Sequence, residues 1–260
     1  MARRAQQAPS EQEFHPENTN QKPKTVSSNS LKVRLDDLKS FPPLTDNQKM
    51  FYDAYKRGDY FVALHGVAGT GKTFIALYKA LEEVLDRGNP FKKIIIVRSA
   101  VPSREVGHLP GDIDEKTDIY RQPYKQICET LFGRKDAYDR LEEQNYIEFI
   151  STSFIRGMSF DDAIIIVDEM QNMTYEEIDT VMTRVGYRSK IIWCGDYRQT
   201  DLNKKKNDMS GILKFFDIAM HMHAFTRIEF LPNDIVRSSL VKEYILAKLK
   251  YEDHTENKRD

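Results

Sequence analysis

Short apolar runs alternate with amphipathic segments along most of the chain. Six runs rich in β-branched or aromatic residues predict buried strands, at residues 60–65, 94–97, 147–150, 163–167, 191–194 and 225–231. Most of the segments between them carry apolar residues at helical spacing or helix-capping residues. Strands that are apolar on both faces and separated by helices predict an α/β fold, in which a mostly parallel sheet is covered by helices on both faces.

Caps and periodicity place the expected helices. They cover residues 45–58, 73–86, 124–131 and 174–185, and a last helix, capped by Asp234, runs through Leu249. Gln48 in the first of these helices has two interpretations. Thr45 and Gln48 fit a capping box, and a Gln amide upstream of a phosphate loop could instead bond the edge of adenine. The two roles are compatible.

The expected domain organisation follows from composition. Residues 1–30 are rich in Gln, Asn, Ser, Glu and Pro, and such a segment buries too little apolar surface to offset its ordering entropy. We therefore expect a disordered tail at residues 1–30, a single domain at 31–250 and a charged tail at 251–260. A chain of 260 residues is long enough for such a domain to bury a core.

The stretch after the first predicted strand indicates phosphate binding. It reads Gly66-Val67-Ala68-Gly69-Thr70-Gly71-Lys72-Thr73 and fits G-x-x-x-x-G-K-[ST]. Glycines let the backbone wrap with its N–H groups facing phosphate oxygens. Lys72 would contact the β- and γ-phosphates, and Thr73 would offer its hydroxyl to Mg²⁺. Because an apolar strand precedes this loop and an amphipathic helix follows it, the sequence predicts a nucleoside triphosphate site.

Polar residues follow the fourth and fifth predicted strands. Asp168 stands where such proteins hold Mg²⁺ through water, and Glu169 could deprotonate an attacking water, which favours hydrolysis. Gln199 either senses the γ-phosphate and positions that water, or belongs to an ordinary turn. Ligands bind beyond the carboxyl ends of parallel strands, so we expect Arg98, Asp168 and Asp196 to meet the phosphate loop there.

Charge and cysteine content restrict the remaining possibilities. The net charge of −1 gives no general attraction to nucleic acid, so any such site must be a local patch. The segment from Arg98 to Arg104 and the run Lys204-Lys205-Lys206 are either solvated or hold backbone phosphates. Cys128 and Cys194 suggest no disulfide framework, which is typical of a protein in the cytoplasm. No apolar run is long enough to cross a bilayer, so no membrane association is expected.

Two further features have simple interpretations. His221 and His223 are expected on a helix surface rather than in a metal site. Trp193 and Cys194 lie within a predicted strand and are expected in the core.

Several motifs occur in an order that resembles the PhoH family over roughly residues 45–250. They are residues 66–73, 97–101, 109–112 with Glu115-Lys116, 155–162, 168–172, 183–186, 195–202 and 234–237. The runs at 109–112 and 156–162 are more diagnostic than the phosphate loop, which many families share. This family is similar to the first motor domain of superfamily-1 helicases. The resemblance implies a RecA-like P-loop ATPase that forms homo-oligomers, including rings, and acts with RNA or single-stranded DNA.

The resemblance also implies individual roles for seven residues. In chain order these are adenine recognition by Gln48, phosphate and Mg²⁺ binding by Lys72 and Thr73, Mg²⁺ binding by Asp168, base catalysis by Glu169, γ-phosphate sensing by Gln199 and an arginine finger at Arg237, from the same or a neighbouring subunit. The sequence departs from some relatives, because it has no room for a nuclease domain or a second motor domain. Unwinding by a monomer is therefore not expected.

Three functions remain open at this stage. The leading one is Mg²⁺-dependent ATP hydrolysis coupled to RNA or single-stranded nucleic acid. A small-molecule phosphotransferase would share the phosphate loop, but Glu169 and Gln199 favour water as the acceptor. A nucleotide-gated interaction protein with slow turnover is the third.

Overall fold

The computed structural model of the chain describes residues 32–99, 113–196 and 209–256. The expected tail at residues 1–30, Gln199 and the run Lys204–Lys206 lie outside these residues.

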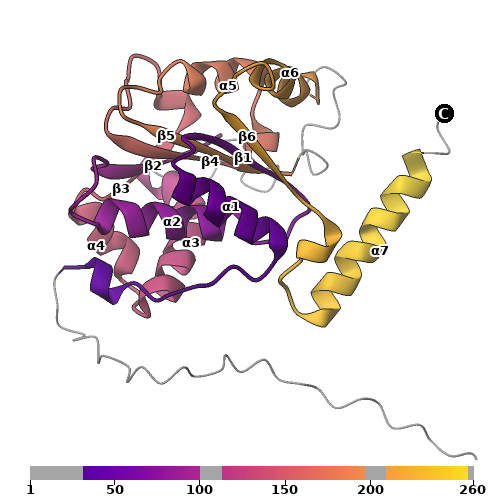
Figure 1. Cartoon of the computed structure of the whole chain (residues 1–260), viewed down its shortest axis with the longest axis horizontal. Coiled ribbons are helices and arrows are strands. Elements are labelled where there is room, and N and C mark those ends of the chain that lie inside the picture. Colours follow the sequence, from indigo (N-terminus) through magenta and orange to yellow (C-terminus); the bar gives the residue numbers. More distant parts are fainter. Residues whose placement is uncertain (1–31, 100–112, 197–208, 257–260) are drawn as a thin grey trace, which may run out of the picture.

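The centre of the described fold is a six-stranded sheet in the order β3-β2-β4-β5-β1-β6 (Figure 1). Its strands are β1 (Phe61–Gly66), β2 (Lys93–Arg98), β3 (Ile147–Ser151), β4 (Ala163–Asp168), β5 (Lys190–Gly195) and β6 (Phe225–Phe230). Each neighbouring pair runs parallel. All six predicted strands are therefore present, and the expectation of a parallel sheet is confirmed. The carboxyl ends of the strands lie along one edge.

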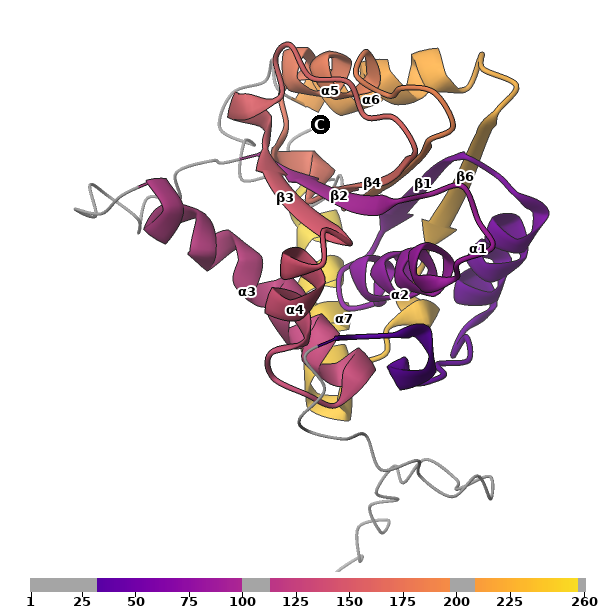
Figure 2. The ribbon, with the colours of Figure 1, turned by 90° about the vertical axis from the view of Figure 1, so that its left-hand side faces the viewer.

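Helices cover both faces of the sheet, as predicted (Figure 2). One face carries α1 (Asp46–Arg57), α2 (Lys72–Leu85), α3 (Ile113–Phe132) and α4 (Ala137–Glu143), and the other carries α5 (Tyr175–Met182) and α6 (Met209–Ala219). Along β2, Ile94 and Ile96 join the core beneath the first group, whereas Ile95 and Val97 join the core beneath the second. This alternation explains why the strands are apolar on both faces. Trp193 and Cys194 are buried on opposite faces, in agreement with their predicted core position.

A capping box formed by Thr174 and Glu177 begins α5, within the helix predicted at 174–185. The Glu177 backbone N–H donates to Thr174 Oγ1 at 3.3 Å, and the Thr174 N–H donates to Glu177 Oε2 at 2.9 Å. Glu177 Oε1 also accepts hydrogen bonds from the hydroxyls of Ser99 and Thr152. Glu177 therefore joins α5 to the segments that leave the carboxyl ends of β2 and β3.

The predicted cap of the last helix was wrong. This helix, α7 (Ser239–Glu256), begins after a 3-10 turn, η4 (Pro232–Asp234), that contains Asp234. The buried Asp234 carboxylate accepts hydrogen bonds from the Leu231 N–H at 2.8 Å and the Asn47 side-chain amide at 2.7 Å. It therefore closes its own turn and fastens that turn to α1, so it does not cap α7.

Two helices were missed, and two are longer than predicted. The sequence interpretation contained no counterpart of α4, which has seven residues, or of α6. The third helix begins at Ile113, well before the expected segment, and α7 continues to Glu256, into the segment expected as a charged tail. None of the helices that the structure describes combines the length and the apolar character that crossing a bilayer requires.

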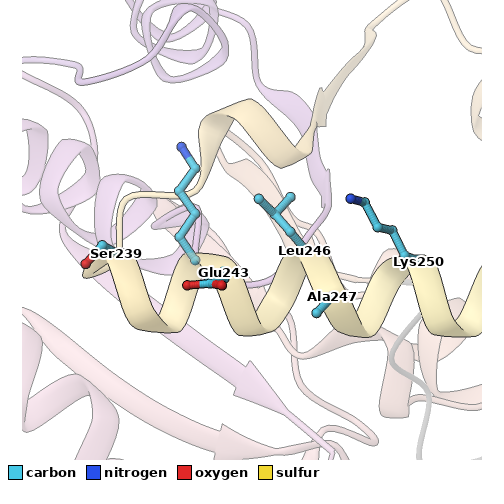
Figure 3. Close-up of a pocket in the computed structure, with 6 residues that line it drawn as sticks. Ser239, Glu243, Leu246, Ala247 and Lys250 are labelled. Atoms are coloured by element: carbon cyan, nitrogen blue, oxygen red, sulfur yellow. The ribbon is translucent and has the colours of Figure 1, made fainter. Parts of the chain in front are cut away.

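Much of the last helix is separate from the helices that cover the sheet (Figure 1), but it meets the phosphate loop, because a Cβ atom on Gly69 would lie 3.3 Å from Ile245 Cδ1. A cavity of about 490 Å³ runs along it and is lined by α7 residues alone, namely Ser239, Lys242, Glu243, Leu246, Ala247 and Lys250 (Figure 3). None of these residues was a candidate for the site, so this cavity is separate from the predicted nucleotide chemistry.

Candidate active site

The phosphate loop joins β1 to α2 at the carboxyl edge of the sheet. Gly66 ends β1 with φ +116°, and a Cβ atom on it would lie 2.2 Å from the Phe230 carbonyl oxygen. Gly71 precedes α2 with φ +81°, a left-handed conformation that favours glycine. The glycine pattern read from the sequence thus has a physical cause at both ends of the loop. The loop delivers the positive end of α2 to the edge where the strands finish.

The Lys72 ammonium is held inside the curve of the loop. Its Nζ donates to the carbonyl oxygens of Gly66 and Val67, both at 2.8 Å, and lies 3.3 Å from Thr70 Oγ1. Burial lowers the pKa of Lys72, while the nearby carboxylates of Asp196, Glu169 and Asp168 act in the opposite direction. A buried cation beside carboxylates suits a ligand that brings both negative charge and a metal ion.

The structure brings Thr73 and Asp168 together from distant parts of the sequence. Thr73 lies in the first turn of α2, Asp168 ends β4, and the Thr73 hydroxyl donates to Asp168 Oδ1 at 2.7 Å. A hydroxyl oxygen beside a carboxylate oxygen fits Mg²⁺, which prefers oxygen donors and takes few of them from the protein when phosphates supply the rest. These two residues could therefore hold the metal ion of a nucleotide complex.

Glu169 lies next to this pair in a strained conformation. Its φ of 53° is left-handed, which is uncommon for a residue other than glycine. Burial, reinforced by the charge of Asp168, raises the pKa of the Glu169 carboxyl, and Arg98 opposes this shift. The Gln171 side-chain amide donates to the Glu169 carboxylate. The Gln171 amide therefore holds this carboxylate within reach of the charge of Asp168.

Arg98 faces the nucleotide site rather than an outer surface. It ends β2, stacks on the Tyr120 ring at 5.6 Å and bonds the Tyr124 hydroxyl. Burial acts to lower the pKa of its guanidinium, but the interactions with Tyr124, Asp168 and Glu169 outweigh burial and raise this pKa. Arg98, the first residue of the segment from Arg98 to Arg104, thus lies within reach of the charges of Asp168 and Glu169. Residues 100–104 lie outside the described part of the chain.

Gln48 forms half of the predicted capping box, and both polar groups of its side chain bond within the chain. Its backbone N–H donates to Thr45 Oγ1 at 3.3 Å, which is half of the capping box. Its side-chain oxygen accepts from the Leu44 N–H at 2.8 Å instead of completing the box, and its side-chain amide donates to the Thr70 carbonyl at 2.9 Å. The buried Gln48 side chain is therefore fixed against the phosphate loop.

Arg237 lies over the phosphate loop of its own chain. The Val236 N–H donates to the Gly69 carbonyl at 3.0 Å, and a Cβ atom on Gly69 would meet Arg237 Cγ at 3.1 Å and Nε at 3.7 Å. The Arg237 side chain remains exposed. A cation beside the loop is thus available within one chain.

Two residues of the site were not singled out by sequence reasoning. Gln171 Oε1 accepts from the Asp196 N–H at 3.0 Å, and its amide holds Glu169, so it connects the ends of β4 and β5. Tyr124 was read only as an apolar position of a helix, yet its hydroxyl donates to Asp168 Oδ2 at 2.9 Å. For Tyr124, the available signal was a polar tip on an otherwise buried stripe. For Gln171, it was only the place of the residue in the motif at 168–172.

The histidines considered for metal binding lie at the surface. His221 and His223 are exposed, as expected, but they lie in the connection between α6 and β6 and not on a helix. Within the described ranges, no group of three or more His, Cys, Asp or Glu side chains gathers in a way that could hold a metal ion.

The parallel sheet, the wrapped glycine loop and the carboxylates at its edge define a RecA-like P-loop domain, a class of protein that binds nucleotides. A family model described as PhoH-like protein matches residues 40–248. The chain belongs to this family, as its motifs suggested.

Curated relatives agree with the family assignment. A PhoH-like protein of Bacillus subtilis is 37% identical over 210 residues, which cover 80% of this chain and 64% of the relative. A PhoH-like protein of Mycobacterium leprae is 34% identical over 228 residues, which cover 86% of this chain and 63% of the relative. The chain therefore spans somewhat less than two thirds of the length of these relatives.

Among solved structures, the large terminase of a thermophilic bacteriophage matches with a TM-score of 0.48 at 11% identity. The match covers 78% of this chain and 50% of the terminase chain.

Proposed function

We propose that the chain hydrolyses ATP with Mg²⁺, and that it couples this reaction to RNA or single-stranded nucleic acid as a homo-oligomer in the cytoplasm. The observation that carries the proposal is the convergence of Lys72, Thr73, Asp168 and Glu169 at one edge of the sheet, with the Thr73 hydroxyl 2.7 Å from the Asp168 carboxylate.

Each residue at this edge has a distinct task in hydrolysis. Lys72 binds the β- and γ-phosphates, and Thr73 and Asp168 hold Mg²⁺. When bound, the metal ion neutralises charge on the phosphate oxygens. Glu169 accepts a proton from the attacking water. The water oxygen bonds to the γ-phosphorus, and the bond between the γ-phosphorus and ADP breaks.

Recognition of the base and sensing of the γ-phosphate complete the proposed site. The Gln48 side-chain amide donates to the Thr70 carbonyl of the phosphate loop, so a base bound at Gln48 would be linked directly to that loop. We assign adenine recognition to Gln48 and γ-phosphate sensing to Gln199 on the family resemblance. Arg237 lies beside Gly69, where a cation could stabilise charge on the transferred phosphoryl group.

The nucleic-acid part of the proposal is supported by the surface beyond β3. The Phe154 side chain is 58% exposed, and Arg156 is exposed two residues later. An exposed aromatic ring with a neighbouring arginine suits stacking on the bases of a single strand. This surface adjoins the bonds from Ser99 and Thr152 to Glu177, so it lies beside the edge that carries the nucleotide chemistry.

The oligomer part is supported by α7. Its Leu240, Tyr244 and Tyr251 side chains are 75%, 68% and 71% exposed, although all three are large and apolar in character. Large exposed side chains of apolar character on one helix suit contact with another copy of the chain.

Single-stranded RNA should raise the rate of ATP turnover, and the effect should fade as salt increases because the phosphate contacts are electrostatic. Phe154→Ala should raise the RNA concentration needed for half-maximal stimulation about 10-fold, through the loss of one stacking partner. The measurement is phosphate release at increasing polyuridylate concentration and low ionic strength.

The matched control is Tyr187→Ala. It removes an aromatic ring of the same kind, 74% exposed and beside Arg188, but at the opposite end of the strands, before β5, so that only the location differs. It should respond to RNA like the wild type. Equal responses of both variants would place RNA elsewhere, and no stimulation by RNA or DNA at low salt would remove the nucleic-acid part of the proposal. Steady phosphate release in buffer alone would argue against both a phosphotransferase and a slow nucleotide-gated switch.

A further inference from the structure

Tyr124 places a hydroxyl group deep inside the protein, against the carboxylate proposed to hold Mg²⁺. The side chain is fully buried, and its ring packs near Phe149 with the ring centroids 5.9 Å apart. The hydroxyl donates to Asp168 Oδ2 at 2.9 Å, while Thr73 donates to Oδ1 of the same carboxylate at 2.7 Å. Each of the two oxygens of Asp168 thus accepts a hydrogen bond from a different residue.

The face of α3 that carries Tyr124 also contacts the end of β2. Tyr120 lies one turn before Tyr124, so the two side chains project from one side of the helix. Arg98, at the end of β2, stacks on the Tyr120 ring and bonds the Tyr124 hydroxyl. Through these two tyrosines α3 contacts the ends of β2 and β4, where Arg98 and Asp168 are already paired in the sheet.

We propose that Tyr124 is a positioning residue for Mg²⁺, and that its hydroxyl holds Oδ2 of Asp168 so that Oδ1 stays directed towards Thr73. This inference rests on the proposed function. Mg²⁺ demands near-ideal octahedral geometry, so a carboxylate that is free to rotate binds it less well than one with a fixed orientation. Partners that orient metal-binding groups typically contribute 10–100-fold to metal affinity.

A purely structural role predicts a different outcome. The Tyr124 ring fills a buried position whether or not it carries a hydroxyl, and phenylalanine preserves that ring. Tyr124→Phe therefore removes only the two hydrogen bonds of the Tyr124 hydroxyl, one with Asp168 and one with Arg98. Loss of packing would weaken nucleotide binding with and without metal, whereas loss of orientation acts only when Mg²⁺ is present.

The test is the affinity of the full chain for a fluorescent, non-hydrolysable N-methylanthraniloyl analogue of ATP, titrated once in saturating MgCl₂ and once in EDTA. The ratio of the two dissociation constants measures the gain from Mg²⁺. Tyr124→Phe should reduce this gain about 10-fold or more, while its affinity in EDTA stays at the wild-type value. Wild-type affinity in EDTA also reports that the variant is folded.

The chain offers a matched control in Tyr138→Phe. Tyr138 is also fully buried, on α4, and within the described residues its hydroxyl has no hydrogen-bond partner. This variant should keep the wild-type gain from Mg²⁺. A wild-type gain in Tyr124→Phe, or an equal loss of affinity with and without metal, would overturn the inference. A wild-type chain whose affinity does not respond to Mg²⁺ at all would overturn the metal-dependent part of the proposed function as well.

Discussion

Replacing Arg237 with alanine should slow ATP hydrolysis about 10³-fold or more while ATP binding persists, because an arginine finger acts on charge that develops in the transition state. The structure supports this role by placing the Arg237 side chain over Gly69, beside the backbone bond from Val236 to the same glycine. The measurements are kcat for phosphate release and the dissociation constant for ATP. Lys250→Ala, which removes an exposed cation farther along α7, is the control and should keep the wild-type rate.

A mixing experiment decides whether Arg237 acts within its own chain. Family resemblance allows an arginine finger from a neighbouring subunit, and in that case mixing Arg237→Ala with Glu169→Gln should restore some activity. The described contact with Gly69 of the same chain instead provides a finger in cis, and the mixture should then stay as inactive as its components. An Arg237→Ala variant within a few-fold of the wild-type rate would contradict both versions.

Replacing Glu169 with glutamine should reduce kcat about 10²–10⁴-fold, because the amide keeps the shape of the side chain but cannot accept the proton of the attacking water. The affinity for ATP with Mg²⁺ should change little, since Lys72, Thr73 and Asp168 remain. Glu176→Gln, at an exposed position in the first turn of α5, is the control and should hydrolyse ATP at the wild-type rate. Full activity of Glu169→Gln would exclude this carboxylate as the base.

The pH dependence of the hydrolysis rate tests the role of Glu169 independently. Burial beside Asp168 raises the pKa of Glu169, and the base is active when it is deprotonated. The rate should therefore fall as pH decreases through that raised pKa, at a higher pH than an exposed glutamate would give. The residual activity of Glu169→Gln should lack this acidic limb, and an unchanged limb would assign it to another group.

The sequence was most informative where structure depends on local pattern and topology. Apolar runs located all six strands of the sheet, and G-x-x-x-x-G-K-[ST] located the loop. A parallel sheet collects the carboxyl ends of its strands at one edge, so the approach of Thr73 to Asp168 could be expected before any distance was known.

Contacts between distant elements could not be read in the same way. Asp234 looked like a helix cap, but it bonds Asn47, which is 187 positions away. Tyr124 looked like one apolar position of an amphipathic helix, and only the packing of α3 against the sheet brings its hydroxyl to Asp168. The position of Arg237 over Gly69 depends on the path of the chain from β6 into α7. These contacts are set by packing between distant elements, so the local pattern does not specify the partner of each side chain.

The most direct test compares phosphate release from ATP by the wild type and by Lys72→Ala, each with Mg²⁺ and with EDTA. Lys72 is the cation that the phosphate loop encloses, with its ammonium 2.8 Å from the carbonyl oxygens of Gly66 and Val67. We expect steady phosphate release by the wild type that requires Mg²⁺, and release at the background rate by Lys72→Ala. Cleavage of ATP by Lys72→Ala at the wild-type rate would contradict the proposed ATPase site.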